Sequence, residues 1–155
     1  MSKYGFSIKT SRDLLDKAKY DAERYNRMDF DERTWSYALM DYIQTAWILA
    51  DWIAAETGQS KTKVRKGIDV LCAGLFKLIE ELAIGQKHWE IDRAGGPQNI
   101  AKTTAPAARY IAGLDGDPMR MHEKPYVIDN DGNKILAGFL IRDTLSAIEK
   151  YLSEV

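Results

Sequence analysis

The sequence predicts an α+β fold that is mostly helical: an antiparallel three-helix core, a small β-hairpin or meander, and a C-terminal helix that closes the bundle. Between residues 11 and 89, apolar side chains recur at spacings of three and four, the period of amphipathic helices. Glycine and proline then become frequent between residues 94 and 125, which disfavours helix. The helical spacing returns at about residue 139.

The first helix is predicted over residues 11–28. Thr10 or Ser11 can act as its N-cap, and Asp13 in the first turn is favourable to the helix dipole. The apolar stripe is thin and consists of Leu15, Ala18, Ala22 and Tyr25. We therefore expect a modest amphipathic helix that buries one face.

The second helix is predicted to follow the capping pair Asp29 and Glu32 and to end at Gly58. Two apolar seams run along it. The first seam comprises Trp35, Leu39, Tyr42, Ala46, Leu49 and Ile53, and the second comprises Met40, Ile43, Trp47, Ala50 and Ala54. Because two adjoining seams exceed what a single-sided helix needs, we expect this helix to be the centre of the core.

The third helix is predicted to run unbroken over residues 60–89. Its seam comprises Val64, Ile68, Leu71, Leu75, Leu78 and Leu82, with Cys72, Phe76, Ile79 and Ala83 alongside. This spacing is close to the period of about 3.5 residues found in helices that cross at shallow angles. Short connections around Asp29 and Gly58 favour an up-down-up arrangement of the three helices. Leu75, Leu78 and Cys72 are expected in the core.

Residues 94–138 are predicted to be rich in loops and short strands. Two apolar runs flank Asn130, Asp131 and Gly132, a sequence typical of a tight hairpin. The closing helix is predicted over residues 139–153, and its apolar face comprises Ile141, Leu145, Ile148 and Leu152. With a helical core at residues 10–93, the 155 residues form one predicted domain.

Composition excludes several classes of protein. The 22 basic and 23 acidic residues leave a net charge of −1, which argues against a dedicated polyanion binder. The single cysteine, Cys72, excludes an intramolecular disulfide. No apolar stretch has the length of a signal peptide or a membrane span, so we expect a cytoplasmic protein without a membrane partner.

The candidate catalytic residues are His88, Asp51 and Glu81. His88 follows Lys87 at the end of the third predicted helix, where it can serve as a base or ligand, or can hydrogen-bond a terminal carbonyl. Asp51 interrupts an apolar run. It lies either on the exposed strip of its helix or in the interior, paired with Arg93, Lys87 or His88.

The sequence has no metal-binding or phosphate-binding motif, so no cofactor is predicted. His122 is the second histidine, and the chain has no paired cysteines and no His-x-x-x-His spacing, so no metal site is predicted. Both phosphate-loop signatures are missing. Four basic side chains at the start of the third helix oppose its dipole, which indicates either anion contact or a solvated face. The candidate binding residues are Lys61, Lys63, Arg65, Lys66, Lys87 and Arg93.

The segments TAWILADW and ELAIGQKHWEID resemble small helical proteins of bacteria and mobile elements that have no assigned activity. The resemblance covers residues 35–152. It implies that the shared pattern comprises Trp47, Asp51, Trp52, Lys87 and His88. Such proteins carry another histidine where this chain has Ile48, so a two-histidine site is not implied here.

A broader resemblance is to the HEPN class of helical bundles, many of which are RNases in toxin and phage-defence systems. Their catalytic signature is an arginine, four to six residues, and then a histidine. The matching positions are Glu81, Leu82 and Ala83 for His88, and Asp115, Gly116 and Asp117 for His122. That RNase chemistry is therefore not expected in its usual form.

The sequence favours a non-catalytic binding or assembly protein, and the resemblance adds a phage, plasmid or defence context. Because the first helix cannot cover both seams of the second, we expect a symmetric homodimer centred on aromatic residues such as Trp35, Tyr37 or Trp52. A protein partner, a nucleotide or RNA are the other candidate partners. The alternative is a HEPN-like or other hydrolytic or nuclease-type enzyme that uses His88 with a nearby carboxylate.

Overall fold

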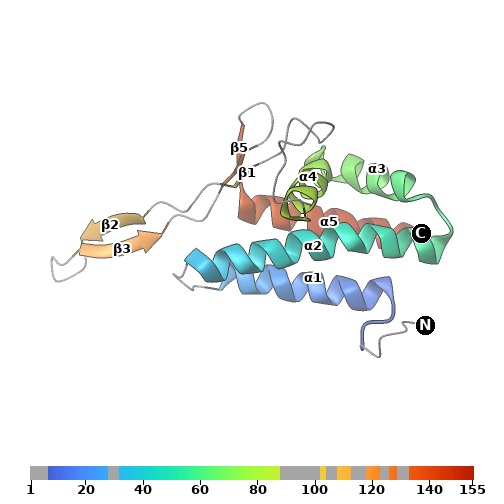
Figure 1. Cartoon of the computed structure of the whole chain (residues 1–155), viewed down its shortest axis with the longest axis horizontal. Coiled ribbons are helices and arrows are strands. Elements are labelled where there is room, and N and C mark those ends of the chain that lie inside the picture. The colour runs from blue at the N-terminus through green and yellow to red at the C-terminus, as the bar shows by residue number, and fades with distance from the viewer. Residues whose placement is uncertain are drawn as a thin grey trace.

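The computed structural model is mostly helical, as predicted (Figure 1). It describes residues 7–27, 32–87, 102–103, 108–112, 118–122, 126–128 and 133–155. At residues 32–35, at 85–87 and at most strand positions up to 128, it describes the backbone alone.

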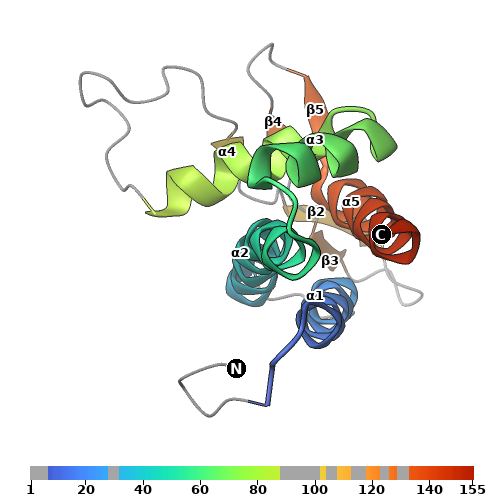
Figure 2. The same ribbon diagram turned by 90° about the vertical axis from the view of Figure 1, so that its right-hand side faces the viewer.

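Three helices lie side by side along the long axis of the molecule, and Figure 2 shows them end-on. They are α1 (Ser11–Asn26), α2 (Glu32–Thr57) and α5 (Ala137–Glu154). Ser11 at the start of α1 donates to Glu56 near the end of α2, whereas Arg24 bonds Asp41 further back along α2. These contacts make α1 and α2 antiparallel neighbours.

Helix α1 begins with the cap that its sequence predicts. The Thr10 hydroxyl accepts the backbone N–H of Asp13 at 3.1 Å, and the Asp13 carboxylate accepts the N–H of Thr10 at 2.9 Å. The backbone N–H groups of Lys9 and Thr10 stabilise this carboxylate and lower its pKa. The helix ends two residues before the predicted boundary, at Asn26.

Both apolar seams of α2 are buried over most of their length. The fully or nearly fully buried residues are Ala38, Leu39, Tyr42, Ile43, Ala46, Leu49, Ala50, Ile53 and Ala54. Each large aliphatic side chain buried here stabilises the fold by about 1.5–3 kcal/mol. Met40 departs from the prediction, because 46% of its surface is exposed. The Tyr42 hydroxyl lies 2.7 Å from the Thr144 hydroxyl and so ties α2 to α5.

The prediction of one unbroken third helix is wrong. The chain forms α3 (Lys61–Leu71) and α4 (Leu75–Lys87), separated by a tight turn. Ala73 and Gly74 take positive φ angles of 53° and 89°. The Gly74 N–H reaches back to the carbonyl of Asp69 at 2.9 Å, and the Ala73 N–H to that of Val70, which is the pattern of a Schellman helix end.

Asp69 also fixes the start of α4. Its carboxylate accepts the backbone N–H of Lys77 at 2.9 Å, satisfying a donor that the first turn of a helix leaves free. The same residue therefore closes α3 through its carbonyl and caps α4 through its side chain. The apolar spacing gave no sign of this turn, because Val64 and Ile68 before it and Phe76 and Ile79 after it are all buried.

Helix α4 crosses the long bundle instead of running along it. It is seen nearly end-on in Figure 1 and lengthwise in Figure 2. The Gln44 side chain of α2 donates to the Ala83 carbonyl of α4 at 3.1 Å. The third long helix of the bundle is therefore α5, not the helix predicted over residues 60–89. Leu78 is buried as predicted, whereas Leu75 is only partly buried.

Cys72 at the end of α3 is buried, with 6% of its surface exposed, which confirms its predicted place in the core. Burial raises the pKa of its thiol, so the unreactive protonated form is favoured at neutral pH. Slow modification by a thiol reagent remains a prediction.

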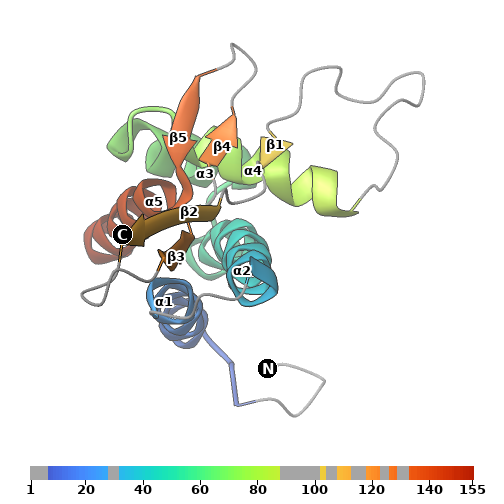
Figure 3. The ribbon, with the colours of Figure 1, turned by 90° about the vertical axis from the view of Figure 1, so that its left-hand side faces the viewer.

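The strands form two small antiparallel sheets. One has the order β1-β4-β5, seen in Figure 3, and the other pairs β2 with β3. Their bounds are β1 Lys102–Thr103, β2 Ala108–Ala112, β3 Pro118–His122, β4 Tyr126–Ile128 and β5 Lys134–Leu136. The predicted hairpin turn at residues 130–132 lies outside the described residues. Strand β5 leads directly into α5, which starts two residues earlier than predicted.

We expect Ala73→Gly to raise the free energy of unfolding by about 0.5–1 kcal/mol. The left-handed conformation of Ala73 is strained because of its Cβ, and glycine removes that strain. Glycine also gives the unfolded chain more freedom, which offsets part of this gain. Equilibrium denaturation measures the change. Gly74→Ala is the matched control and should destabilise. A lower free energy of unfolding for Ala73→Gly than for the wild type would contradict strain at this turn.

Candidate functional site

Asp51 lies in a charged cluster that joins α2, α3 and α4. The Asp51 cluster consists of Trp47, Asp51, Lys61, Arg65 and Glu80. The Lys61 ammonium lies 2.8 Å from one carboxylate oxygen of Asp51, and the Arg65 guanidinium lies 2.8 Å from the other. The side chain is 27% exposed. Asp51 is therefore paired but only partly buried, and its partners are Lys61 and Arg65 of α3 instead of the predicted Arg93, Lys87 or His88.

Arg65 is the centre of this cluster. One terminal nitrogen bonds Asp51 on α2 and the other bonds Glu80 on α4 at 3.1 Å. Its guanidinium carbon lies 5.5 Å from the centre of the Trp47 ring, within reach of a cation–π interaction. The planar fork of arginine can meet two carboxylates and a ring at once, which a lysine cannot do. Arg65 therefore fixes the relative positions of three helices.

An open depression of about 250 Å³ lies next to Arg65, between α3 and α4. The residues that line this α3–α4 depression are Thr62, Arg65, Lys66, Asp69, Phe76, Lys77 and Glu80. Its two carboxylates already accept hydrogen bonds, Glu80 from Arg65 and Asp69 from the backbone of Lys77. Within the described residues, the ammonium groups of Lys66 and Lys77 have no carboxylate partner.

Only some of the other predicted site residues lie in the Asp51 cluster or the α3–α4 depression. Glu80, and not its neighbour Glu81, shares Arg65 with Asp51, while Glu81 is half-buried on the same helix. Lys63 is exposed on α3 and lines no part of the depression. The predicted residues at or beyond the end of α4 are Lys87, whose side chain is not described, and His88 and Arg93, which lie outside the described residues.

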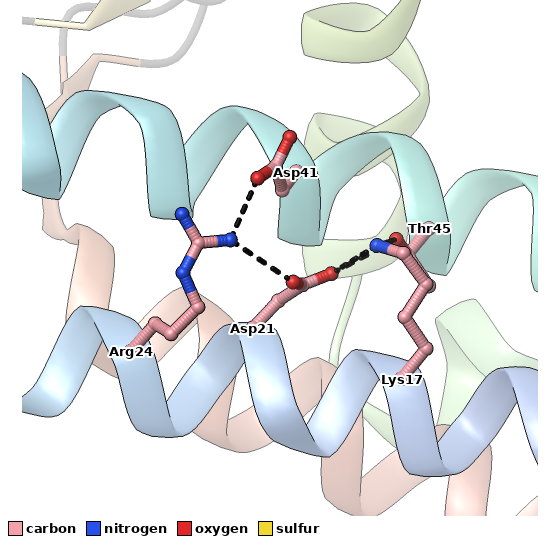
Figure 4. Close-up of polar contacts among 5 residues, drawn as sticks. All are labelled: Lys17, Asp21, Arg24, Asp41 and Thr45. Carbon is pink, nitrogen blue, oxygen red and sulfur yellow. Dashed lines mark hydrogen bonds and ion pairs between the residues drawn. The ribbon is translucent and has the colours of Figure 1, made fainter.

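A second polar cluster, which was not predicted from the sequence, lies between α1 and α2 (Figure 4). The Asp21 cluster consists of Lys17, Asp21, Arg24, Asp41 and Thr45. Asp21 is 1% exposed, and its carboxylate accepts from Lys17 at 2.6 Å and from the Thr45 hydroxyl at 3.0 Å. The nearby carboxylate of Asp41 raises the pKa of Arg24.

The signal for this cluster was present in the sequence. Lys17, Asp21 and Arg24 stand four and three residues apart, so one helix face brings them together. Asp21 also sits beside Ala22 of the predicted apolar stripe. Both flanking cations keep partial access to water, at 40% and 26% exposure, while the acid between them is enclosed. These ion pairs and hydrogen bonds hold α1 against α2.

No family model matches the chain, and neither the curated proteins nor the solved structures contain a match.

In the part of the chain that is described, no three His, Cys, Asp or Glu side chains are grouped so as to hold a metal ion. None of the described helices combines the length and apolar character needed to cross a membrane.

We expect Asp21→Asn to lower the free energy of unfolding by about 1–3 kcal/mol. The amide removes the negative charge that Lys17 and Arg24 face and replaces one acceptor oxygen with a donor group, and the partial exposure of both cations limits the cost. Asp16→Asn is the matched control, since it removes the same charge from an exposed position of α1 and should change stability by less than about 0.5 kcal/mol. Equal losses of unfolding free energy for the two variants, measured by chemical denaturation, would contradict this structural role of Asp21.

Proposed function

We propose that this chain is a non-catalytic binding or assembly protein of the cytoplasm, with its binding surface on α3 and α4. The observation that carries the proposal is the state of Asp51. Each of its two oxygens accepts a charge-assisted hydrogen bond from α3, so the carboxylate holds two helices together. Because Lys61 and Arg65 each pair with one oxygen, these contacts support a structural role for Asp51 over the role of a general base.

The α3–α4 depression supports a binding role in another way. It combines fixed side chains, positioned by Arg65 and Asp69, with the two lysines that have no carboxylate partner in the described structure. Concave sites with a few convergent polar groups are where small ligands bind. The basic residues predicted as a binding set contribute Arg65 and Lys66 to this surface.

Self-association is part of the proposal. Tyr37, Met40 and Ile48 are exposed apolar side chains on α2, with 58%, 46% and 41% of their surfaces open to solvent. Their spacing of three and eight residues places them along one side of the helix. Such a stripe suits an isologous contact with a second copy of the chain. The phage, plasmid or defence context remains a proposal that rests on the resemblance alone.

We expect wild-type protein, Asp51→Asn and His88→Gln to show the same background rate with RNA and with nucleoside triphosphates. The alternative function is an HEPN-like or other nuclease-type enzyme that depends on His88. Hydrolysis that His88→Gln abolishes, at an unchanged melting temperature, would establish the enzyme and exclude the non-catalytic proposal. Product formation is followed by electrophoresis and by phosphate release.

We expect light scattering at micromolar concentration to give about twice the 17.6 kDa mass of one chain. Tyr37→Glu should shift the protein toward the monomer, because it places a charge in the proposed contact. Tyr20→Glu is the matched control on α1, where the tyrosine is 53% exposed. A wild-type mass of a single chain would contradict the homodimer.

A further inference from the structure

We propose that the α3–α4 depression binds one small phosphate-type anion, held between Lys66 and Lys77. The inference rests on the proposed binding function and specifies its ligand. Lys66 stands on α3 and Lys77 on α4, and both line the same depression. The turn at residues 72–74 folds the two helices against each other and brings these lysines to one site.

The positive charges in the depression are less fully paired than the negative ones. Glu80 is engaged by Arg65, and Asp69 accepts the backbone N–H of Lys77. Both terminal nitrogens of Arg65 are committed to carboxylates. The two ammonium groups have no carboxylate partner, whereas each carboxylate already accepts one hydrogen bond through one of its oxygens. The unpaired positive charge in the depression therefore favours an incoming acceptor that carries negative charge.

Charge and size favour a single small anion over a nucleic acid. Three cations and two carboxylates line the depression, which leaves a local net charge of only +1. A strand of nucleic acid needs a track of cations, and here Asp69 and Glu80 would repel its successive phosphates. A volume of about 250 Å³ suits a phosphate with a small organic group. A phosphate, with about two negative charges at neutral pH, can engage both lysines, whereas a carboxylate carries one.

The test uses inorganic phosphate as the probe, titrated into the full chain at constant ionic strength and followed by amide chemical shifts. We expect saturable shifts at residues 62–69 and 76–80. Lys66→Gln with Lys77→Gln should weaken binding about ten-fold, since each exposed ion contact contributes up to about five-fold. The charge-matched control is Lys9→Gln with Lys134→Gln, two exposed positions outside the depression, which should leave binding within about two-fold.

Each other outcome overturns the proposal. Shifts that do not saturate, or equal weakening in the two double variants, would show general charge attraction only. Acetate binding as tightly as phosphate would exclude the phosphate preference, and a single-stranded RNA oligonucleotide that displaces phosphate at lower concentration would make the surface a nucleic-acid site. The melting temperatures of both double variants establish that they fold. Loss of phosphate binding without any hydrolytic activity would leave the non-catalytic function standing, so the two proposals fail separately.

Discussion

Burial of α2 is the constraint on which the rest of the structure depends. Two adjoining apolar seams require neighbours over about half of the helix surface, and α1, α3, α4 and α5 all pack against it. The long helices α1 and α5 cover one part of this surface along the bundle axis. The crossing helix α4 covers another part, near Gln44. Because apolar burial has no direction of its own, it does not decide how these neighbours are oriented.

Polar contacts at the edges of the buried surface supply that orientation. Asp21 fixes α1 against the middle of α2, and Asp51 with Arg65 fixes α3 and α4 against its C-terminal half. An enclosed or half-enclosed carboxylate tolerates few arrangements, because it must keep its cations within reach. Such contacts select one packing among several that would bury similar apolar area.

The turn at Ala73 and Gly74 links fold and proposed function. A continuous helix over residues 60–89 would spread Lys66 and Lys77 about 16 Å apart along one axis. The change of direction at the turn instead places both at the α3–α4 depression. The carbonyl and carboxylate of Asp69 both serve this turn. A local backbone feature thus brings Lys66, from the predicted basic segment, and Lys77 to one concave surface.

The sequence by itself determined the helical class, the cap of α1 at Thr10, the two buried seams of α2 and the burial of Cys72. These follow from spacing and local hydrogen bonding, which neighbouring residues specify. Tertiary structure alone decided that α3 and α4 separate, that α5 is the third long helix, and that Asp51 meets Lys61 and Arg65. An apolar spacing is the same on both sides of a turn, and a carboxylate does not encode which distant cation reaches it. Those outcomes depend on which packing of the helices buries the apolar side chains and pairs the charged groups at the same time.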